Sequence, residues 1–273
     1  MKTSEETLAR LRECPHYGIA ELREIMQALR SENGCPWDKE QTHKSIRQDL
    51  LEECYEAVEA IDMDSVPMLR EELGDVLLQV VFHCQIEAEQ GHFTFDDICD
   101  ELCRKLVVRH PHVFGDVQVS GSDDVLRNWD AIKAETKQQE SATDTLEGVC
   151  KALPALMYAQ KLGKRAGRAG MDWKNAEDAF QYIRRETDEL EEAMQSGDAD
   201  AVSEELGDLL FSCVNTARHL HVDAETALRA ASEKFLRRFA ETEKRVTADG
   251  KRMQDLPIEE LDIYWDDAKK ALH

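Results

Sequence analysis

The chain has 273 residues, of which 42% are hydrophobic, so it is long enough to bury a core and too apolar to be a disordered polyelectrolyte. Its 57 acidic and 34 basic residues give a formal net charge of −23, which repels the backbones of nucleic acids and the surfaces of anionic membranes. We therefore expect neither a nucleic-acid partner nor a membrane partner.

The composition favours an all-helical protein, and we expect it to be located in the cytoplasm. Six prolines and 13 glycines are few for a chain with many tight β-turns, whereas long stretches rich in Ala, Leu, Glu, Lys, Arg and Gln favour helix. No run of about 18 apolar residues occurs, and residues 1–12 are polar rather than a signal peptide. The eight cysteines are scattered without a Cys-x-x-Cys pair, which is typical of reduced thiols in a cytoplasmic protein.

The predicted helices form two similar series along the chain. In each series two helices follow one another across a short turn, and periodicity places these helices at 45–61, 68–89, 175–195 and 200–220. Pro67 suits the first turn of the second helix. Asp96 and Asp223 precede a further helix in each series, and we expect both to act as N-caps. The sequence thus predicts helical hairpins with flanking helices and requires no strand.

A repeat organises the chain. Residues 51–78 and 184–210 both contain Glu-x-x-Glu followed, 16 positions later, by Glu-Glu-Leu-Gly-Asp. A Trp beside an Asp precedes each copy, and a basic pair at i, i+4 spacing and a Trp-Asp-x-x-Lys motif follow it. Four landmarks in the same order indicate a tandem repeat of two helical-bundle modules. We place the modules at 15–118 and 149–273, joined by a linker at 119–148 that contains a short helix near 123–137.

The repeated acids are candidate metal ligands. Residues at i and i+3 share a helical face, so the turn of each hairpin brings two acidic pairs face to face. Facing carboxylates repel unless a cation or protons neutralise them, and all-oxygen ligation suits Mg²⁺, or Mn²⁺ in its place. A glycine in the middle of each second helix, Gly74 and Gly207, predicts a close approach of the two helices. The candidate ligands are Glu53, Glu56, Glu72 and Asp75 in the first copy and Glu186, Glu189, Glu205 and Asp208 in the second.

Three other interpretations of these acids remain open. In a chain with 33% charged residues, acidic helix faces are commonly just solvated surface, although repetition at a fixed spacing favours a site. A di-iron carboxylate bundle is disfavoured, because neither copy has a His three residues after a ligand Glu. A non-catalytic module that senses nucleotides, or that binds a protein partner through its acidic face, is the main alternative to an enzyme.

Basic and aromatic residues of the second module supply what a phosphate ligand needs. Lys234 and Arg238 lie one helical turn apart with Arg237 beside them, and they are suited to neutralise phosphate oxygens. Lys164 and Arg165 belong to a basic helix face near the start of the module. Such faces are more often solvated surface, but an acidic site in the same module favours binding. Trp265 is expected either to stack on a nucleobase or to pack in the core.

The combined motifs resemble one known family. The segments CPWDKEQTHKS (35–45), LLEECYEAVEAI, REELGDVLLQVVFH, KLVVRHPHVFG and EKFLRRF are similar to the MazG family of nucleoside triphosphate pyrophosphohydrolases, and the similarity covers nearly the whole chain. The resemblance implies an all-α homodimer that hydrolyses NTPs and dNTPs to the monophosphate and pyrophosphate with Mg²⁺.

The resemblance also implies roles for individual residues. The family's EExxE and ExxD elements fall on Glu52, Glu53, Glu56, Glu72 and Asp75 in the first copy. In the second copy Arg185 stands where the first Glu of EExxE belongs, and it is expected to meet a phosphate instead. The phosphate-binding basic positions correspond to Lys234 and Arg238, and the nucleotide-contacting tryptophan to Trp265.

The expected reaction is attack of an activated water on the α-phosphorus. Either Glu186 or Glu189 is expected to accept the proton of that water, and both alternatives stay open. The basic residues favour the second module as the main nucleotide site. The first module keeps all its acids, so it is expected either to bind metal as well or to serve mainly in dimerisation.

Overall fold

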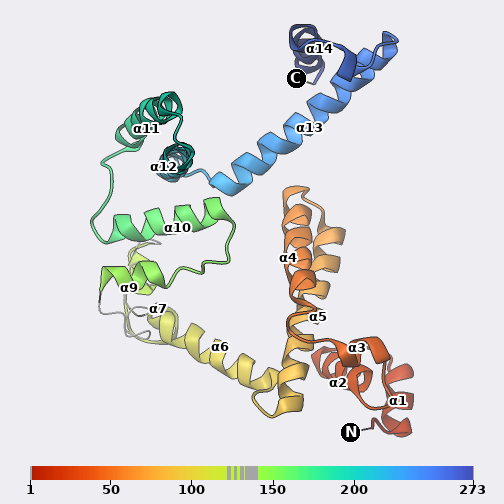
Figure 1. Ribbon diagram of the computed structural model, residues 1–273. Coiled ribbons are helices and arrows are strands. Elements are labelled where there is room, and N and C mark those ends of the chain that lie inside the picture. The colour runs from red at the N-terminus through yellow and green to blue at the C-terminus, as the bar shows by residue number, and fades with distance from the viewer. Residues whose placement is uncertain (1, 122–123, 126–127, 130–131, 133–140, 273) are drawn as a thin grey trace. The chain divides into compact units, whose positions relative to one another are not determined.

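The computed structural model describes residues 2–121, 124–125, 128–129, 132 and 141–272, and these residues contain helices and no strand. The predicted all-α fold is therefore confirmed. The chain divides into two compact units, Met1–Ile132 and Lys133–His273 (Figure 1). The short helix predicted near 123–137 lies mostly outside the described residues. None of the described helices combines enough length with enough apolar character to cross a lipid bilayer.

A helical hairpin dominates the first unit. Its helices α4 and α5 run antiparallel, because only three residues, 63–65, join them, and Asp64 adopts a left-handed conformation (φ 51°) at this turn. Pro67 lies in the first turn of α5, as predicted. The helices of this unit are α1 (Glu5–Arg12), α2 (Ile19–Arg30), α3 (Pro36–Glu40), α4 (Arg47–Asp62), α5 (Val66–Gln90), α6 (Phe95–Arg109) and α7 (Pro111–Phe114).

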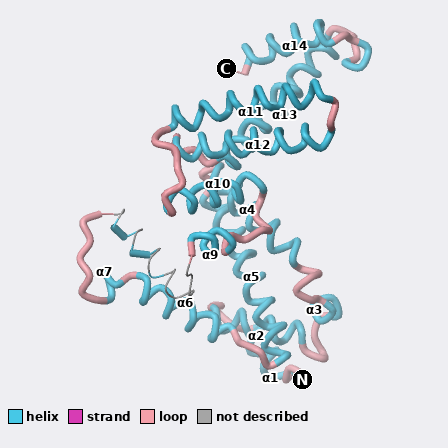
Figure 2. Tube along the Cα trace, turned by 60° about the vertical axis from the view of Figure 1, so that its left-hand side comes forward, coloured by secondary structure: helices cyan, strands magenta, loops and turns pink. Residues whose placement is uncertain are grey.

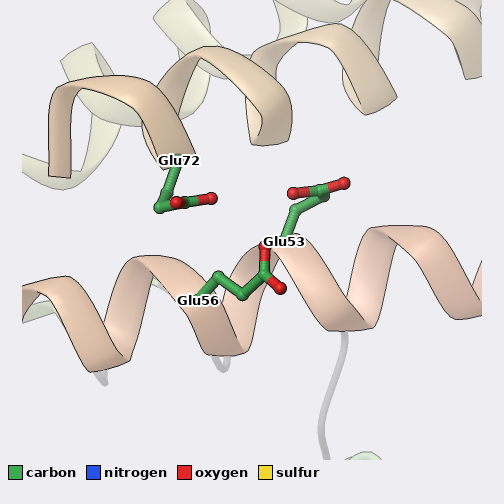
Figure 3. A group of neighbouring side chains, drawn as sticks. All are labelled: Glu53, Glu56 and Glu72. Carbon is green, nitrogen blue, oxygen red and sulfur yellow. The ribbon is translucent and has the colours of Figure 1, made fainter. Parts of the chain in front are cut away.

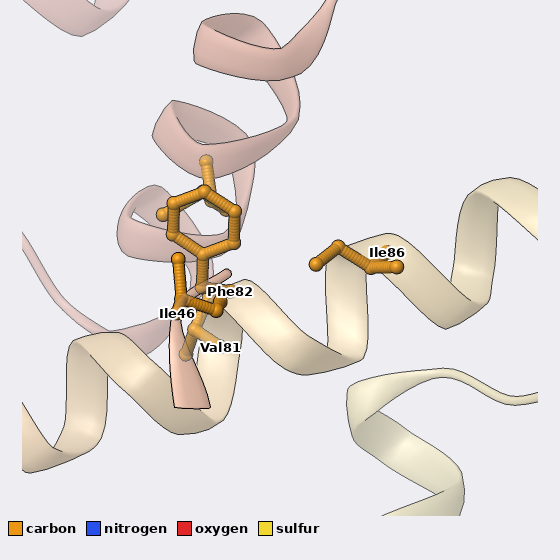
Figure 4. Close-up of a cluster of buried hydrophobic side chains, with 5 residues drawn as sticks. Ile46, Val81, Phe82 and Ile86 are labelled. Carbon is orange, nitrogen blue, oxygen red and sulfur yellow. The ribbon is translucent and has the colours of Figure 1, made fainter. Parts of the chain in front are cut away.

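The apolar core of the first unit lies at the end of the hairpin far from its turn. Met26 of α2, Ile46 just before α4, and three residues in the second half of α5 form one buried cluster (Figure 4). The three α5 residues are Val81, Phe82 and Ile86. Burying a side chain of this size contributes roughly 1.5–3 kcal/mol. Because the core holds this end of the hairpin, the end next to the turn is left to carry polar side chains.

A buried arginine adds a polar tie to this core. The side chain of Arg30 on α2 is only 6% exposed, and it forms two hydrogen bonds of 2.9 Å with the carboxylate of Glu89 on α5. Its guanidinium also donates to the backbone carbonyl of Gln41, at 3.2 Å. A buried charge requires such partners. Arg30 thus fastens α2 and the segment after α3 to α5.

A chain of hydrogen bonds joins the segment before α4 to α5. His43 Nδ1 lies 2.7 Å from His83 Nδ1, His43 Nε2 lies 2.5 Å from Glu87 Oε1, and His92 Nδ1 lies 2.6 Å from Glu87 Oε2. Because an ionised carboxylate only accepts, His43 and His92 both donate to Glu87. Burial, and after it the charge of the neighbouring His43, lower the pKa of His83.

The second unit repeats the hairpin. Helices α11 and α12 run side by side in opposite directions (Figure 2), joined by Gly197 in the left-handed region (φ 74°) and Asp198. The side chain of Asp198 accepts from the backbone amides of Asp200 and Ala201 and caps α12. The helices of this unit are α9 (Ala142–Glu147), α10 (Ala155–Arg168), α11 (Ala176–Ser196), α12 (Ala199–His219), α13 (Ala224–Ala248), the 3₁₀ turn η1 (Met253–Asp255) and α14 (Ile258–Ala271).

The four predicted hairpin helices are confirmed within two residues at each end, and one of the two predicted caps is wrong. Asp223 caps α13 by accepting from the amide of Thr226 at 2.8 Å, as expected. Asp96 does not cap α6. Thr94 is the N-cap there, in a reciprocal pair with Asp97, and Asp96 instead forms an ion pair with Arg23 on α2. Because Arg23 on α2 binds Asp96, Asp97 is the acid that pairs with the N-cap Thr94.

Close packing and an ion pair fasten α10 to α12. Gly163 of α10 lies against α12, because a Cβ there would lie 2.2 Å from Asn215 Oδ1 and would force this buried side chain to shift. Beyond α10, Asp172 accepts from both terminal nitrogens of Arg218 and from His219 Nε2, the latter at 2.9 Å. Hydrogen bonding to Arg218 is the main reason that the pKa of Asp172 falls to about 2. This carboxylate connects the segment before α11 to the end of α12.

We expect Asp172→Asn to lower the free energy of unfolding of the second unit by about 2 kcal/mol at pH 7. The depressed pKa of Asp172 sets the sign: its contribution is complete above the unfolded value near 3.8 and disappears as the pH falls toward about 2. Urea unfolding followed by circular dichroism at pH 7 and at pH 3 measures both effects. Asp262→Asn, an equal change of charge on exposed α14, is the control. Equal urea midpoints for the two variants at pH 7 would contradict the role of the pair.

Candidate functional site

The acids of the first hairpin converge near its turn. Glu53 and Glu56 project from α4 toward Glu72 on α5 (Figure 3), and each offers a carboxylate oxygen within 4.8 Å of the other two. Around one Mg²⁺ ion, neighbouring ligand oxygens are separated by about 3 Å. Small rotations of these side chains therefore suffice to place three oxygens around a single hard cation.

The second hairpin builds a matching cluster from equivalent helices. Carboxylate oxygens of Glu186 on α11 and of Glu205 and Asp208 on α12 also lie within 4.8 Å of one another. The donor set contains only carboxylate oxygens, which Mg²⁺ and Mn²⁺ prefer to nitrogen or sulfur. The structure thus brings together three of the four predicted ligands in each copy.

The fourth acid differs between the copies. In the first copy the fourth acid is Asp75, which lies close enough to raise the pKa values of Glu53 and Glu72. In the second copy the fourth acid is Glu189, whose Oε1 accepts from Arg185 Nε at 2.8 Å. Asp75 and Glu189 therefore lie next to their clusters, but neither belongs to the three acids whose oxygens lie within 4.8 Å of one another.

Burial and like charges both raise the pKa values of acids in the two clusters. Partial burial raises the pKa of Glu205, and the charges of Glu189, Asp208 and Glu204 raise it further. Burial, and after it the charge of Asp75, also raise the pKa of Glu53. Carboxylates that repel one another in this way are stabilised by a bound cation. The arrangement therefore fits an ion better than it fits a solvated surface of separate acids.

The explanation that the sequence suggested for the two glycines is wrong. Gly74 and Gly207 lie between the acids of α5 and α12, and we expected them to allow close approach of the two helices of each hairpin. A Cβ at either position would meet nothing within 4 Å. The partner helix of the hairpin lies elsewhere on the surface of α5 or α12, so both glycines face open space.

The predicted phosphate-binding residues lie on other helices of the second unit. The side chains of Lys234, Arg237 and Arg238 project from α13 and make no hydrogen bond or ion pair with any described residue. Lys164 lies exposed on α10. Arg165 on the same helix donates to the backbone carbonyl of Thr145 and so holds α9. Among the described residues, none of these five cations forms an ion pair with an acid of the second cluster.

The tryptophan of each copy packs against the helix that carries the basic pair. The ring of Trp265 on α14 lies 5.2 Å from that of Phe235 on α13, and Phe235 stacks on Phe239. In the first copy Arg109 lies over the ring of Trp129 at 5.3 Å. The rest of that motif, including Lys133, lies mostly outside the described residues. Sequence reasoning missed Phe235 and Phe239, although both directly follow a residue of the basic pair.

Comparisons with known proteins agree with this arrangement. A family model described as the MazG nucleotide pyrophosphohydrolase domain matches the chain twice, at residues 41–114 and 174–241. Each match contains one acidic hairpin and most of the basic helix after it.

Curated relatives align over nearly the whole chain. A nucleoside triphosphate pyrophosphohydrolase/pyrophosphatase MazG of Thermotoga maritima is 47% identical over 91% of this chain and 94% of its own length. A nucleoside triphosphate pyrophosphohydrolase of Escherichia coli is 46% identical over 92% of this chain and 97% of its own. The protein YabN of Bacillus subtilis is 41% identical over 94% of this chain and 52% of its own.

We expect Glu205→Gln to raise the melting temperature in EDTA by a few degrees, because it removes one repelling charge from the cluster. The same variant should lose much of the stabilisation that millimolar Mn²⁺ gives to the wild type. Differential scanning fluorimetry with and without Mn²⁺ measures both shifts. Glu204→Gln, one position away on the same helix, is the matched control and should respond to Mn²⁺ as the wild type does. A Glu205→Gln variant that keeps the full Mn²⁺ response would remove Glu205 from the ligands.

Proposed function

The chain belongs to the MazG nucleotide pyrophosphohydrolase family, and from this premise we propose that it hydrolyses nucleoside triphosphates to the monophosphate and pyrophosphate with Mg²⁺. The observation that carries the proposal is the pair of carboxylate clusters, each formed between the two helices of a hairpin. Their all-oxygen donors suit Mg²⁺, and Mn²⁺ in its place. The names of the aligned Thermotoga and Escherichia proteins supply the substrate class.

The acids of the second hairpin would hold the metal and receive a proton. Glu186, Glu205 and Asp208 are the candidate ligands, with Glu189 as a fourth once Arg185 releases it. Bound there, Mg²⁺ would neutralise phosphate charge and lower the pKa of water at the site. Of the two candidate bases, Glu186 is favoured over Glu189, because burial and neighbouring acids raise the pKa of Glu186 while Glu189 is paired with a cation. Glu186 then takes the proton of the water that attacks the α-phosphorus.

The basic and aromatic residues of α13 and α14 complete the proposal. Lys234 and Arg238 are free of other partners among the described residues, which leaves their charge for the departing pyrophosphate. Trp265 and Phe235 form an aromatic pair beside them, suited to stack against a nucleobase. In the equivalent part of the first unit, Arg109 lies over the ring of Trp129 and covers a face that a nucleobase would need. We therefore place the main nucleotide site in the second unit.

We further propose that the chain forms a homodimer through its first hairpin. Its outer face carries six apolar side chains, at i, i+4 and i+7 on each helix, that are 36–54% exposed. The equivalent α11 positions of the second hairpin are the polar residues Arg184, Asp188 and Glu191. An apolar face this regular matches the packing of a four-helix bundle made by two copies, and the open space at Gly74 gives a partner helix room. The six residues are Leu51, Tyr55, Val58, Leu73, Leu77 and Val80.

Glu189→Gln and Glu186→Gln test the activity. Each should lower the rate of pyrophosphate release from a panel of NTPs and dNTPs by about 100-fold or more while helical circular dichroism is unchanged, because each removes a carboxylate from the metal site or the base. Glu191→Gln, the same change of charge on the opposite side of α11, is the control and should retain wild-type activity. Parallel assays of Glu56→Gln report whether the first cluster contributes. Full activity in both Glu186→Gln and Glu189→Gln, or release of orthophosphate alone by the wild type, would refute the proposed function.

The double variant Val58→Glu with Leu77→Glu tests the dimer. It places charges in the centre of the apolar face, so we expect the mass measured by analytical ultracentrifugation to fall from that of a dimer to that of one chain. Met171→Glu, at an exposed loop position of the second unit, should leave the mass unchanged. A double variant that keeps the dimer mass would place the interface elsewhere on the chain.

A further inference from the structure

The two acidic clusters differ in charge at one position. Arg185 lies one residue before Glu186 on α11, and the equivalent residue on α4 of the first copy is Glu52, one residue before Glu53. Arg185 Nε donates to Glu189 Oε1 at 2.8 Å. Glu52 has no such role: its side chain accepts from Gln48 at 3.4 Å, away from the other acids. One cluster therefore contains its own cation, and the other does not.

This cation changes which acids converge. In the first copy the three closest acids include Glu56, whereas in the second copy they exclude its equivalent, Glu189. The ion pair with Arg185 accounts for the difference, because it draws the Glu189 carboxylate back along its own helix. Arg185 also lowers the pKa of Glu186, against the burial and the neighbouring acids that raise it. None of the main charges acting on Glu53 is positive.

The ion pair is easily exchanged for other partners. The side chains of Arg185 and Glu189 are 65% and 37% exposed, so water screens their attraction. A divalent cation competes well for a carboxylate held only by such a pair. The freed guanidinium would then need an anion, and its fork of donors matches a phosphate group through two hydrogen bonds.

We propose that Arg185 makes metal binding at the second cluster depend on the triphosphate. While the cluster is empty, Arg185 pairs with Glu189. When metal and nucleotide enter together, Glu189 turns to the metal and Arg185 turns to a phosphate oxygen. The first cluster has no such cation, so it binds a divalent ion without nucleotide. The inference rests on the proposed function, because it assigns metal and triphosphate to the second cluster.

Mn²⁺ titration of the full chain tests the inference, with free Mn²⁺ followed by electron paramagnetic resonance. The titration is made with and without α,β-methylene-dATP, in which a carbon bridge blocks release of pyrophosphate. Without nucleotide the wild type should show a tighter and a weaker class of site, and the analogue should tighten the weaker one. Glu56→Gln should abolish the tighter class, and Glu189→Gln the weaker class.

Arg185→Gln is the decisive variant. Without nucleotide it should bind Mn²⁺ at the weaker site about two- to fivefold more tightly than the wild type, the range for loss of one exposed ion pair. It should also lose most of the tightening that the analogue causes. Arg185→Lys keeps the charge and should behave more like the wild type without nucleotide. Arg184→Gln is the matched control, because the neighbouring Arg184 lies over Phe180 and donates to Gln181 instead of a cluster acid.

The outcomes separate this inference from the proposed function. If Glu189→Gln weakens Mn²⁺ binding but Arg185→Gln binds as the wild type does in both conditions, the role of Arg185 is overturned and the metal site stands. Assignment of the weaker class to the first cluster also overturns the inference. If neither Glu56→Gln nor Glu189→Gln alters Mn²⁺ binding, the metal sites are refuted, and the proposed function is refuted with them.

Discussion

Repulsion among carboxylates gathered between two helices is the constraint on which the rest of this structure depends. Burial, and after it the charges of the neighbouring acids, raise the pKa values of Glu53 on α4 and Glu205 on α12. A hairpin that carries such a cluster near its turn cannot rely on that end for stability. Its stability must come from the opposite end and from neighbouring helices, and the fold meets this demand in both copies.

The two copies meet the demand with different residues. The first hairpin is held by an apolar cluster around Phe82, by buried Arg30 paired with Glu89, and by the hydrogen-bonded chain from His83 through His43 to Glu87. The second hairpin is held by the close contact of Gly163 with α12 and by Arg218 bound to Asp172. The shared acidic motif thus coexists with unrelated stabilising contacts, which indicates that the two modules are specialised rather than interchangeable.

The same specialisation appears in the surfaces of the hairpins. The outer face of α4 and α5 is apolar at regular helical spacing, which suits contact with a second chain, whereas in the second hairpin the α12 positions Leu206 and Leu210 stay apolar but the equivalent positions of α11 are charged. Both modules have a basic helix with a tryptophan beside it, but among the described residues only the second has an arginine paired with an acid of its cluster. These differences are the basis of our proposal that the first module assembles the dimer and the second binds the nucleotide.

The sequence by itself determined the all-α fold, the tandem repeat, the four hairpin helices and the helix faces on which the acids lie. These features follow from local periodicity and from the short turns, which require no knowledge of distant residues. Only the tertiary structure decided that Glu53 and Glu56 meet Glu72, and that Glu186 meets Glu205 and Asp208, because these acids lie on two helices that the fold must place side by side. It also decided that Asp96 pairs with Arg23 instead of capping α6, and that Gly74 faces open space. Helical spacing determines the direction in which a side chain points. Its partner on another helix depends on which segment the fold places beside it.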